Sequence, residues 1–292
     1  MDQRFTALYD QYVQGSLDRR AFVERLSVLA GSAAAAAVAL PMISADKAEA
    51  ITVLEIDPRI KTQTVAIPGG PANFTGYLAT PSGIGRQAGG AKKPGLIIVG
   101  ENRSVNANIK DLARRFATEG YVALAVDYLS PVGGAPVDPE LAAQMTFKLK
   151  AEDVITWFKA ASKYLKSRPD VGKVGAVGYS WGGGVVNDLI IEDPTLDAVV
   201  TYYGRNPTDL KKVGQIRAPL MGHYAALDNT TLQQIPAFDA ALTAAGKNHT
   251  FYIYPGTNNG FVNDTNPARW EPVASLLSWN RNLDFFRKYL AG

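Results

Sequence analysis

The sequence predicts an α/β protein with a mostly parallel central sheet and helices on both faces. From Leu96 to Leu290, short apolar runs typical of buried strands alternate with stretches of helical periodicity. Strands that alternate with helices pair in parallel through right-handed crossovers, and ligands of such sheets bind at the carboxyl ends of the strands. A Gly-rich turn around residue 180, between an apolar strand and an apolar helix, indicates where the chemistry takes place.

The composition is that of a soluble globular enzyme. The chain has 292 residues, of which 47% are hydrophobic and 20% charged. The formal net charge is +3 and the basic residues are scattered, which does not indicate a nucleic-acid partner. The sequence has no Cys and 2 His, which excludes thiolate catalysis and disfavours a metal centre. We therefore expect no metal, and the sequence does not predict the oligomeric state.

Residues 1–50 are expected to be a leader or a helical extension, and residues 51–292 the folded domain. Arg19-Arg20 precede the alanine-rich apolar run Leu26 to Leu40, and Ala48-Glu49-Ala50 has the small-x-small pattern of a cleavage site. This segment resembles a twin-arginine export signal and predicts a periplasmic or exported protein. The alternative is a two-helix extension that packs on the domain of a cytoplasmic protein. The apolar run is too short for a membrane span, which takes about 20 residues.

The elements of the domain are predicted in chain order. A hairpin is expected first, because two β-prone runs flank a Pro-Gly-rich turn at 68–71. The expected strands are Thr62 to Ile67, Phe74 to Thr80, Leu96 to Val99, Tyr121 to Val126, Lys173 to Val177, Ala198 to Tyr203, Pro219 to Tyr224 and Thr250 to Tyr254. The expected helices are Ile109 to Thr118, Ala142 to Leu165, Val185 to Ile191, Ile235 to Ala245 and Val273 to Leu290.

The turn at residue 180 has the sequence of a nucleophile elbow. Gly178-Tyr179-Ser180-Trp181-Gly182 is a Gly-x-Ser-x-Gly set between a strand and a helix, which predicts the α/β-hydrolase fold with Ser180 as nucleophile. The alternative is a glycine-rich turn that packs closely or binds a phosphate, although the usual dinucleotide pattern does not fit.

The acid and the base of a triad should follow on later loops. Asp228 lies after the strand Pro219 to Tyr224, and it can serve as the acid or cap the following helix. The base belongs on the loop after the last strand, and residues 254–261 contain no histidine.

From about Leu96 to Leu290 the chain resembles the dienelactone hydrolase family, in particular its exported branch. The matching motifs are Glu101-Asn102-Arg103, Gly178 to Gly183, Tyr202-Tyr203-Gly204-Arg205, His223-Tyr224 through Leu227-Asp228, and Tyr254-Pro255-Gly256 through Gly260-Phe261. The resemblance implies a single-domain hydrolase of small-molecule lactones or esters that needs no cofactor.

The chain departs from the family pattern at three positions. The family has cysteine where this chain has Ser180, and its histidine falls on Asn259. Serine performs the same acyl chemistry when a base takes its proton, but an asparagine amide has no usable pKa. The family arginine that holds a substrate carboxylate falls on Asn263, which does not favour a dienelactone substrate.

The resemblance also suggests roles for other residues. It places Glu101 near the nucleophile, where the carboxylate can act as base or pair with an arginine, and it gives the oxyanion hole to the backbone N–H groups of Trp181 and Asn102. His249 is expected to be structural. The predicted substrate-binding residues are Arg103, Tyr128, Tyr203, Arg205, His223 and Phe261, with ordinary core packing as the alternative for the aromatic ones and a supporting role for His223.

Three functions remain open at this point. The first is a serine hydrolase that forms an acyl-Ser180 intermediate, in which Asn259 is an engineered replacement that inactivates the enzyme. The second is a native lyase or isomerase that uses Glu101 and the oxyanion hole. The third is an exported binding protein that inherited the fold.

Overall fold

The computed structural model describes residues 53–83 and 92–291, together with Gln11, Ala21 and Arg25. Apart from these three residues, the predicted leader at 1–50 lies outside the described part of the chain, so export stays a prediction. None of the helices in the described segments is long and apolar enough to cross a membrane.

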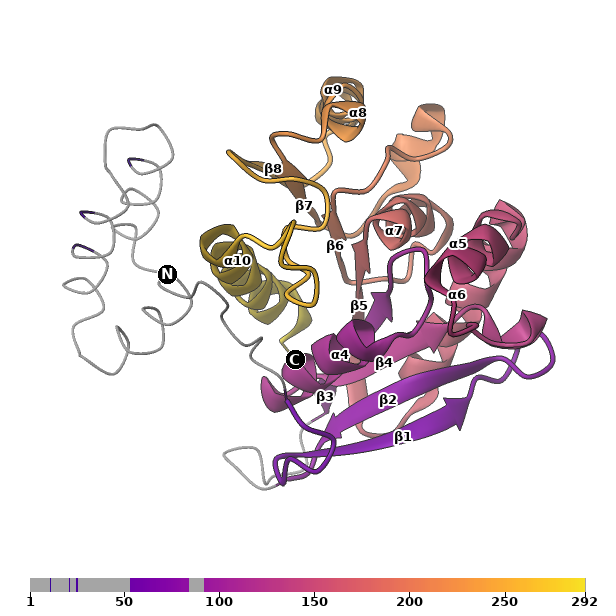
Figure 1. The fold of residues 1–292 in the computed structure, drawn as a ribbon. Helices are drawn as coiled ribbons and strands as arrows, with labels where there is room; N and C mark the ends of the chain where they lie inside the picture. The colour runs from indigo at the N-terminus through magenta and orange to yellow at the C-terminus, as the bar shows by residue number, and fades with distance from the viewer. Residues whose placement is uncertain (1–10, 12–20, 22–24, 26–52, 84–91, 292) are drawn as a thin grey trace.

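A single eight-stranded sheet forms the centre of the domain, with helices on both faces (Figure 1). Its strands, in chain order, are β1 (Ile60–Ala66), β2 (Thr75–Pro81), β3 (Lys93–Val99), β4 (Val122–Asp127), β5 (Val171–Tyr179), β6 (Ala198–Tyr202), β7 (Leu220–Ala225) and β8 (His249–Tyr254). Their spatial order is β1-β2-β4-β3-β5-β6-β7-β8, with β1 and β2 antiparallel to their neighbours and all other pairs parallel. The predicted α/β architecture and hairpin are confirmed.

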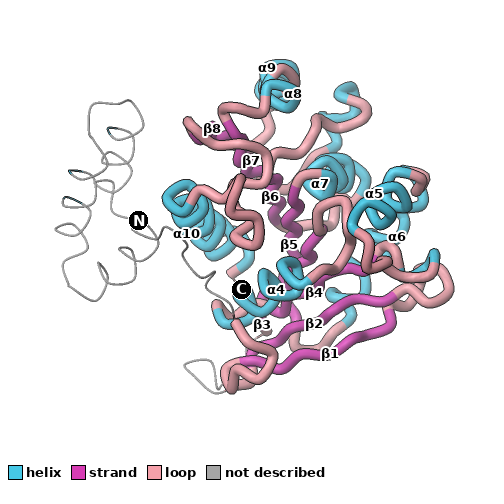
Figure 2. Tube along the Cα trace, in the orientation of Figure 1, coloured by secondary structure: helices cyan, strands magenta, loops and turns pink. Residues whose placement is uncertain are grey.

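The helices divide into two layers that cover opposite faces of the sheet (Figure 2). One core lies under α4 (Ala107–Thr118) and α10 (Pro272–Leu290). The other lies under α6 (Ala151–Ser167), α7 (Trp181–Glu192) and α9 (Ile235–Ala244). Shorter elements complete the fold, namely α5 (Pro139–Phe147), α8 (Asn229–Leu232) and two 3-10 turns, η1 (Ser130–Val132) and η2 (Leu210–Gln215).

Strand β3 shows why the central runs are apolar at every position. Ile98 packs into the core under α4 and α10, while its neighbour Ile97 packs into the core on the other face, and both are completely buried. Successive side chains of a strand point to opposite faces, so a strand covered by helices on both sides needs a continuous apolar sequence.

The single helix predicted over Ala142 to Leu165 is wrong, because the structure has two helices there, α5 and α6. Lys150 is extended, with ψ at 134°, and Glu152 and Asp153 occupy the first turn of α6, where acidic side chains favour a helix start. Residues on both sides of the break have helical periodicity, so the pattern did not reveal it. The break lets Thr146 at the end of α5 donate a hydrogen bond to the carbonyl oxygen of Asn102 at 2.9 Å.

The strand register brings three predicted site residues together at the carboxyl edge of the sheet. Val99 of β3 is paired with Gly178 of β5, and Tyr179 of β5 with Tyr202 of β6. Strand β5 lies between β3 and β6 in the sheet, so the segments that lead to Glu101 and Tyr203 leave the sheet on either side of the segment that leads to Ser180.

Candidate active site

Ser180 has the strained backbone of a nucleophile elbow. Its φ is 53° and its ψ is −112°, in a region that residues other than glycine rarely adopt, which costs about 1–3 kcal/mol. The conformation is held by two hydrogen bonds. The N–H of Ser180 donates to the carbonyl of Tyr202 at 3.0 Å, and its own carbonyl accepts from the N–H of Gly184 at 3.1 Å.

Two glycines allow helix α7 to start directly at the edge of the sheet. A Cβ added at Gly178 would lie 2.1 Å from the carbonyl oxygen of Gly182, and one added at Gly182 would lie 2.4 Å from that of Gly100. Any side chain at these positions would therefore push α7 away from β3 and β5. The close approach brings the first N–H groups of α7, which have no intrahelical acceptor, to the position of Ser180.

Asp228 and Asn259 are joined by a hydrogen bond at the same edge. The amide Nδ2 of Asn259 donates to Oδ2 of Asp228 at 2.8 Å. Asp228 also caps α8, because it accepts from the N–H of Thr231 at 3.2 Å and from its hydroxyl at 2.7 Å. The cap is one of the two roles considered for Asp228, and the same carboxylate contacts the residue at the position of the family histidine, while its role as the acid of a triad stays a prediction.

Glu101 follows β3 and contacts the loop after β8. Its Oε2 accepts a hydrogen bond of 3.4 Å from the amide of Asn263. Burial raises the pKa of Glu101, while the hydrogen bond from Asn263 and the charges of Arg103 and Arg269 act in the opposite direction. Arg205, the other arginine considered as its partner, instead forms an ion pair of 2.5 Å with Asp188 of α7.

The loop that carries Glu101 and Asn102 is braced from the core side. Tyr128 donates a short hydrogen bond to the carbonyl of Glu101 and accepts one of 2.8 Å from the N–H of Ser104. Its ring lies 4.5 Å from that of Trp181. The carbonyl of Glu101 and the N–H of Asn102 belong to one planar trans peptide, so a carbonyl fixed on Tyr128 directs this N–H to the opposite side.

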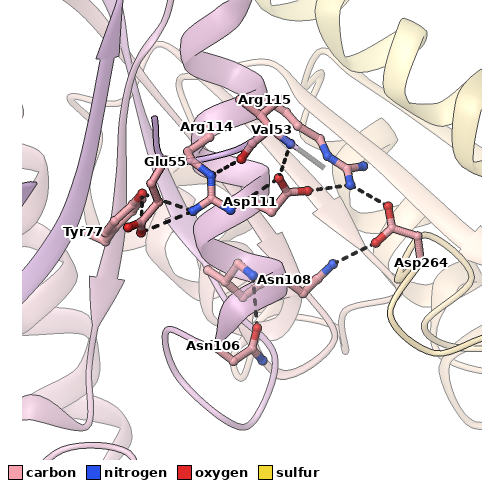
Figure 3. A network of polar contacts seen from close by, with 10 residues as sticks. Val53, Glu55, Tyr77, Asn106, Asn108, Asp111, Arg114, Arg115 and Asp264 are labelled. Carbon is pink, nitrogen blue, oxygen red and sulfur yellow. Dashed lines mark hydrogen bonds and ion pairs between the residues drawn. The ribbon is translucent and has the colours of Figure 1, made fainter. Parts of the chain in front are cut away.

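The loop after β8 is anchored to α4 by a buried polar network (Figure 3). Arg115 of α4 contacts Asp264 of this loop at 2.6 Å and Asp111 of its own helix at 2.5 Å. Asn108 donates to the other oxygen of Asp264 at 3.3 Å. Asp264 follows Asn263 directly in sequence, so the network fixes the part of the loop that reaches Glu101.

The structure shows what the predicted substrate-binding residues contact, and their contacts to substrate stay a prediction. His223 is completely buried, and its ring nitrogens contact the hydroxyl of Tyr254 at 2.8 Å and Oδ1 of Asn282 at 2.9 Å, which fits the supporting role considered for it. Tyr128, Tyr203 and Phe261 are buried as well, and the ring of Phe261 packs against that of Tyr203. Arg205 is held by α7, as described above.

The remaining histidine lies as predicted, far from the site. His249 starts β8, and its ring contacts Asp239 at 3.0 Å and the carbonyl of Lys247 at 2.9 Å, all at the amino end of the parallel strands.

Three residues of the site were missed by sequence reasoning. Thr146 braces Asn102, Asn263 contacts Glu101, and Arg269 donates to the carbonyl of Asn259 at 3.4 Å. Arg269 comes ten residues after Asn259, and no motif marks it. Asn263 was noticed as the place of a missing arginine, but not as a hydrogen-bond donor.

The strained serine between β5 and α7, together with a carboxylate after β7 and the asparagine bonded to it after β8, is typical of an α/β-hydrolase. The model of the dienelactone hydrolase family matches residues 74–290, so the chain belongs to that family. As a member of this family, the protein is a hydrolase of the lactone or ester type that acts on a small molecule.

The chain is similar to several proteins of this family. It is 29% identical over 243 residues to a protein of Methylorubrum extorquens that bears the provisional name carboxymethylenebutenolidase, covering 77% of this chain and 80% of the relative. A relative of the same name from Escherichia coli O157:H7 is 28% identical, with coverage of 80% and 89%. The crystal structure of a provisionally named dienelactone hydrolase from Klebsiella pneumoniae subsp. pneumoniae matches with a TM-score of 0.68 and 25% identity, covering 79% of this chain and 99% of that one.

Proposed function

We propose that this chain is a serine hydrolase that cleaves an ester or lactone through an acyl-Ser180 intermediate. The observation that carries the proposal is the left-handed backbone of Ser180, with φ at 53°, at the turn between β5 and α7. A residue other than glycine persists in such a conformation only where the surrounding structure holds it, and such residues cluster at active sites.

Asn259 fills only part of the role of a triad histidine. Its amide donates to Asp228 at 2.8 Å, as the Nδ1–H of a histidine would do from this position. The amide cannot take a proton at neutral pH, so it orients the loop and leaves proton transfer to another group. Glu101 follows β3, the strand paired with the strand of Ser180, and its raised pKa suits it to accept a proton.

The reaction then proceeds in two stages. Oγ of Ser180 attacks the substrate carbonyl carbon while Glu101 takes its proton, and the bond to the leaving oxygen breaks to give the acyl-enzyme. The N–H groups of Trp181 and Asn102 receive the oxyanion. One proton leaves with the alcohol, which returns Glu101 to its ionised form. Glu101 then takes a proton from water, the hydroxide attacks the acyl carbon, and Glu101 gives the proton to Oγ of Ser180 as the acyl bond breaks and the acid is released.

The test restores the missing base. Asn259→His is expected to raise kcat/KM on p-nitrophenyl acetate and simple lactones by about a hundredfold or more, because loss of a triad histidine costs on the order of a millionfold. Asn259→Gln is the matched control, since it enlarges the side chain without adding a base.

A fluorophosphonate probe gives the second measurement. It should label the unaltered chain at Ser180, as located by mass spectrometry, and should not label Ser180→Ala. Equal rates for Asn259→His and Asn259→Gln, or turnover that survives Ser180→Ala, would contradict the proposal, and the second result would favour a lyase or isomerase.

A further inference from the structure

Tyr203 carries a buried hydroxyl that the mechanism above does not use. It follows β6 directly, its side chain is 2% exposed, and its hydroxyl has no hydrogen-bond partner in the described part of the chain. Buried polar groups are nearly always paired, because leaving one unpaired costs free energy. Such a group beside a nucleophile therefore calls for an explanation.

The backbone of Tyr203 is also strained. Its φ is 39°, a left-handed value that is unfavourable for a bulky residue. The N–H of Tyr203 donates to the carbonyl of His223 at 2.7 Å, and its ring packs edge-on against Phe261 with centroids 5.6 Å apart. Backbone and ring are thus firmly held, and together they keep the hydroxyl in a place where no protein group satisfies it.

The surroundings keep this hydroxyl protonated and ready to donate. Burial raises the pKa of Tyr203 well above its ordinary value of 10, and the negative charge of Glu101 raises it further. Arg269 acts in the opposite direction. Glu101 has this effect only while it is ionised, so the proton of Tyr203 becomes easier to release once Glu101 has accepted the proton of Ser180.

We infer that Tyr203 is a catalytic residue that donates its hydroxyl proton to the leaving oxygen of the substrate. The inference rests on the proposed function and completes it. A triad histidine takes the proton of the nucleophile and then gives it to the leaving group, and Asn259 can do neither. Glu101 follows β3 and Tyr203 follows β6, the two strands that flank the strand of Ser180, and the charge of Glu101 acts on the hydroxyl of Tyr203.

Every proton that moves during formation of the acyl-enzyme has a donor and an acceptor. Oγ of Ser180 forms a bond to the carbonyl carbon, and its proton passes to Glu101. As the bond to the leaving oxygen breaks, that oxygen takes the proton of Tyr203 and departs as an alcohol. The protonated Glu101 then returns a proton to the Tyr203 phenolate, so both groups end in their starting state, and the net result is one proton moved from Ser180 to the alcohol.

Tyr224 provides a matched control. Its hydroxyl is likewise buried without a partner among the described residues, and its side chain is completely buried. Its ring lies edge-on to Phe251, 5.3 Å away. Tyr224 comes after His223 on β7 and so points to the opposite face of the sheet from that residue. Removing its hydroxyl has the same chemical effect at a place without a nucleophile.

The experiment compares esters that do and do not need a proton donor. Tyr203→Phe is expected to lower kcat/KM for ethyl acetate by about a hundredfold, within the range for general acid catalysis. Its rate on p-nitrophenyl acetate should change by less than about threefold, because p-nitrophenolate leaves without protonation. Tyr224→Phe should leave both rates unchanged. Neither variant should have a lower thermal midpoint, since each loses an unpaired buried hydroxyl.

Two results would overturn the inference. One is an equal loss on both esters in Tyr203→Phe, which would indicate a disturbed pocket; the other is no loss on either. Failure of the proposed function looks different, because the unaltered chain would then show no fluorophosphonate label at Ser180 and no turnover of either ester.

Discussion

Two groups of buried polar side chains lie next to each other in this domain, and they are built in opposite ways. At the carboxyl edge, Ser180 and Tyr203 have left-handed backbones, and the hydroxyl of Tyr203 is unpaired among the described residues. Between the sheet and α10, His223 and Asn282 are completely buried and have hydrogen bonds to their polar groups.

The second group is a chain of hydrogen bonds with a defined direction. Asn282 donates to the hydroxyl of Tyr202 at 2.7 Å, so its oxygen faces Nε2 of His223 at 2.9 Å. This arrangement places the ring proton on Nε2 and leaves Nδ1 to accept from Tyr254, which itself accepts from Arg281 at 3.0 Å.

The comparison indicates that residues that stabilise the fold and residues proposed to act in catalysis occupy different regions of the domain. The network around His223 has satisfied groups and fixes α10 on the sheet, whereas the edge at Ser180 keeps groups strained and unpaired, at a cost in stability. Substitutions in the two places should therefore have opposite effects on rate and on stability.

The largest expected effect is on rate. Glu101→Gln should lower kcat/KM about 10²- to 10⁴-fold, because it removes the proposed base. In the unaltered chain the rate should fall toward acid pH, through a pKa above the ordinary 4.5, since Glu101 must be ionised to accept a proton. The variant should lack this acid limb in a pH–rate profile.

The same substitution should not weaken the fold. A raised pKa means that the ionised form of Glu101 opposes folding at neutral pH, so glutamine should leave the free energy of unfolding equal or higher in urea titrations. Glu119→Gln, on an exposed glutamate after α4, is the control for loss of a carboxylate. If Glu101→Gln lowered both the rate and the free energy of unfolding, Glu101 would stabilise the fold, and the proposed difference between the two regions would be contradicted.

The next effect is on stability. Asn282→Leu leaves Nε2 of His223 unpaired and removes one of the two partners of the Tyr202 hydroxyl, which keeps Ser278, so the free energy of unfolding should fall by about 1–3 kcal/mol. Activity per folded molecule should stay within about threefold. Asn280→Leu, on the same helix, is the control, and a fall in activity without a fall in stability would show that the network serves the chemistry.

The smallest effect is a dependence of stability on pH. Burial lowers the pKa of His223 from 6.5 to about 3. Below pH 6.5 the unfolded chain binds a proton that the folded chain does not, so the stability present above that pH is lost as the pH falls toward 3. From pH 7 to pH 5 the loss should be about 2 kcal/mol. Urea unfolding at the two pH values measures it, and His223→Gln should reduce the loss; parallel losses in both proteins would assign it to other groups.

Much of the candidate site could be predicted because its residues stand at strand ends. Ser180 and Asp228 were found from the order of strands and loops, since each follows an apolar run that had to be buried. His223 was named as a candidate for the same reason, with a supporting role as the alternative. It stands near a strand end as well, and nothing local shows that α10 covers it and that Asn282, fifty-nine residues later, takes its nitrogen.

The sequence by itself determined the alternating architecture, the elbow and the family, because local periodicity and glycine placement specify which strands are buried and where the backbone turns sharply. Only the tertiary structure decided that Asn259 reaches Asp228, that Asn263 contacts Glu101, and that His223 is buried under α10. Those facts depend on register between strands far apart in the chain, and on which helix covers them, and no short stretch of sequence contains that information.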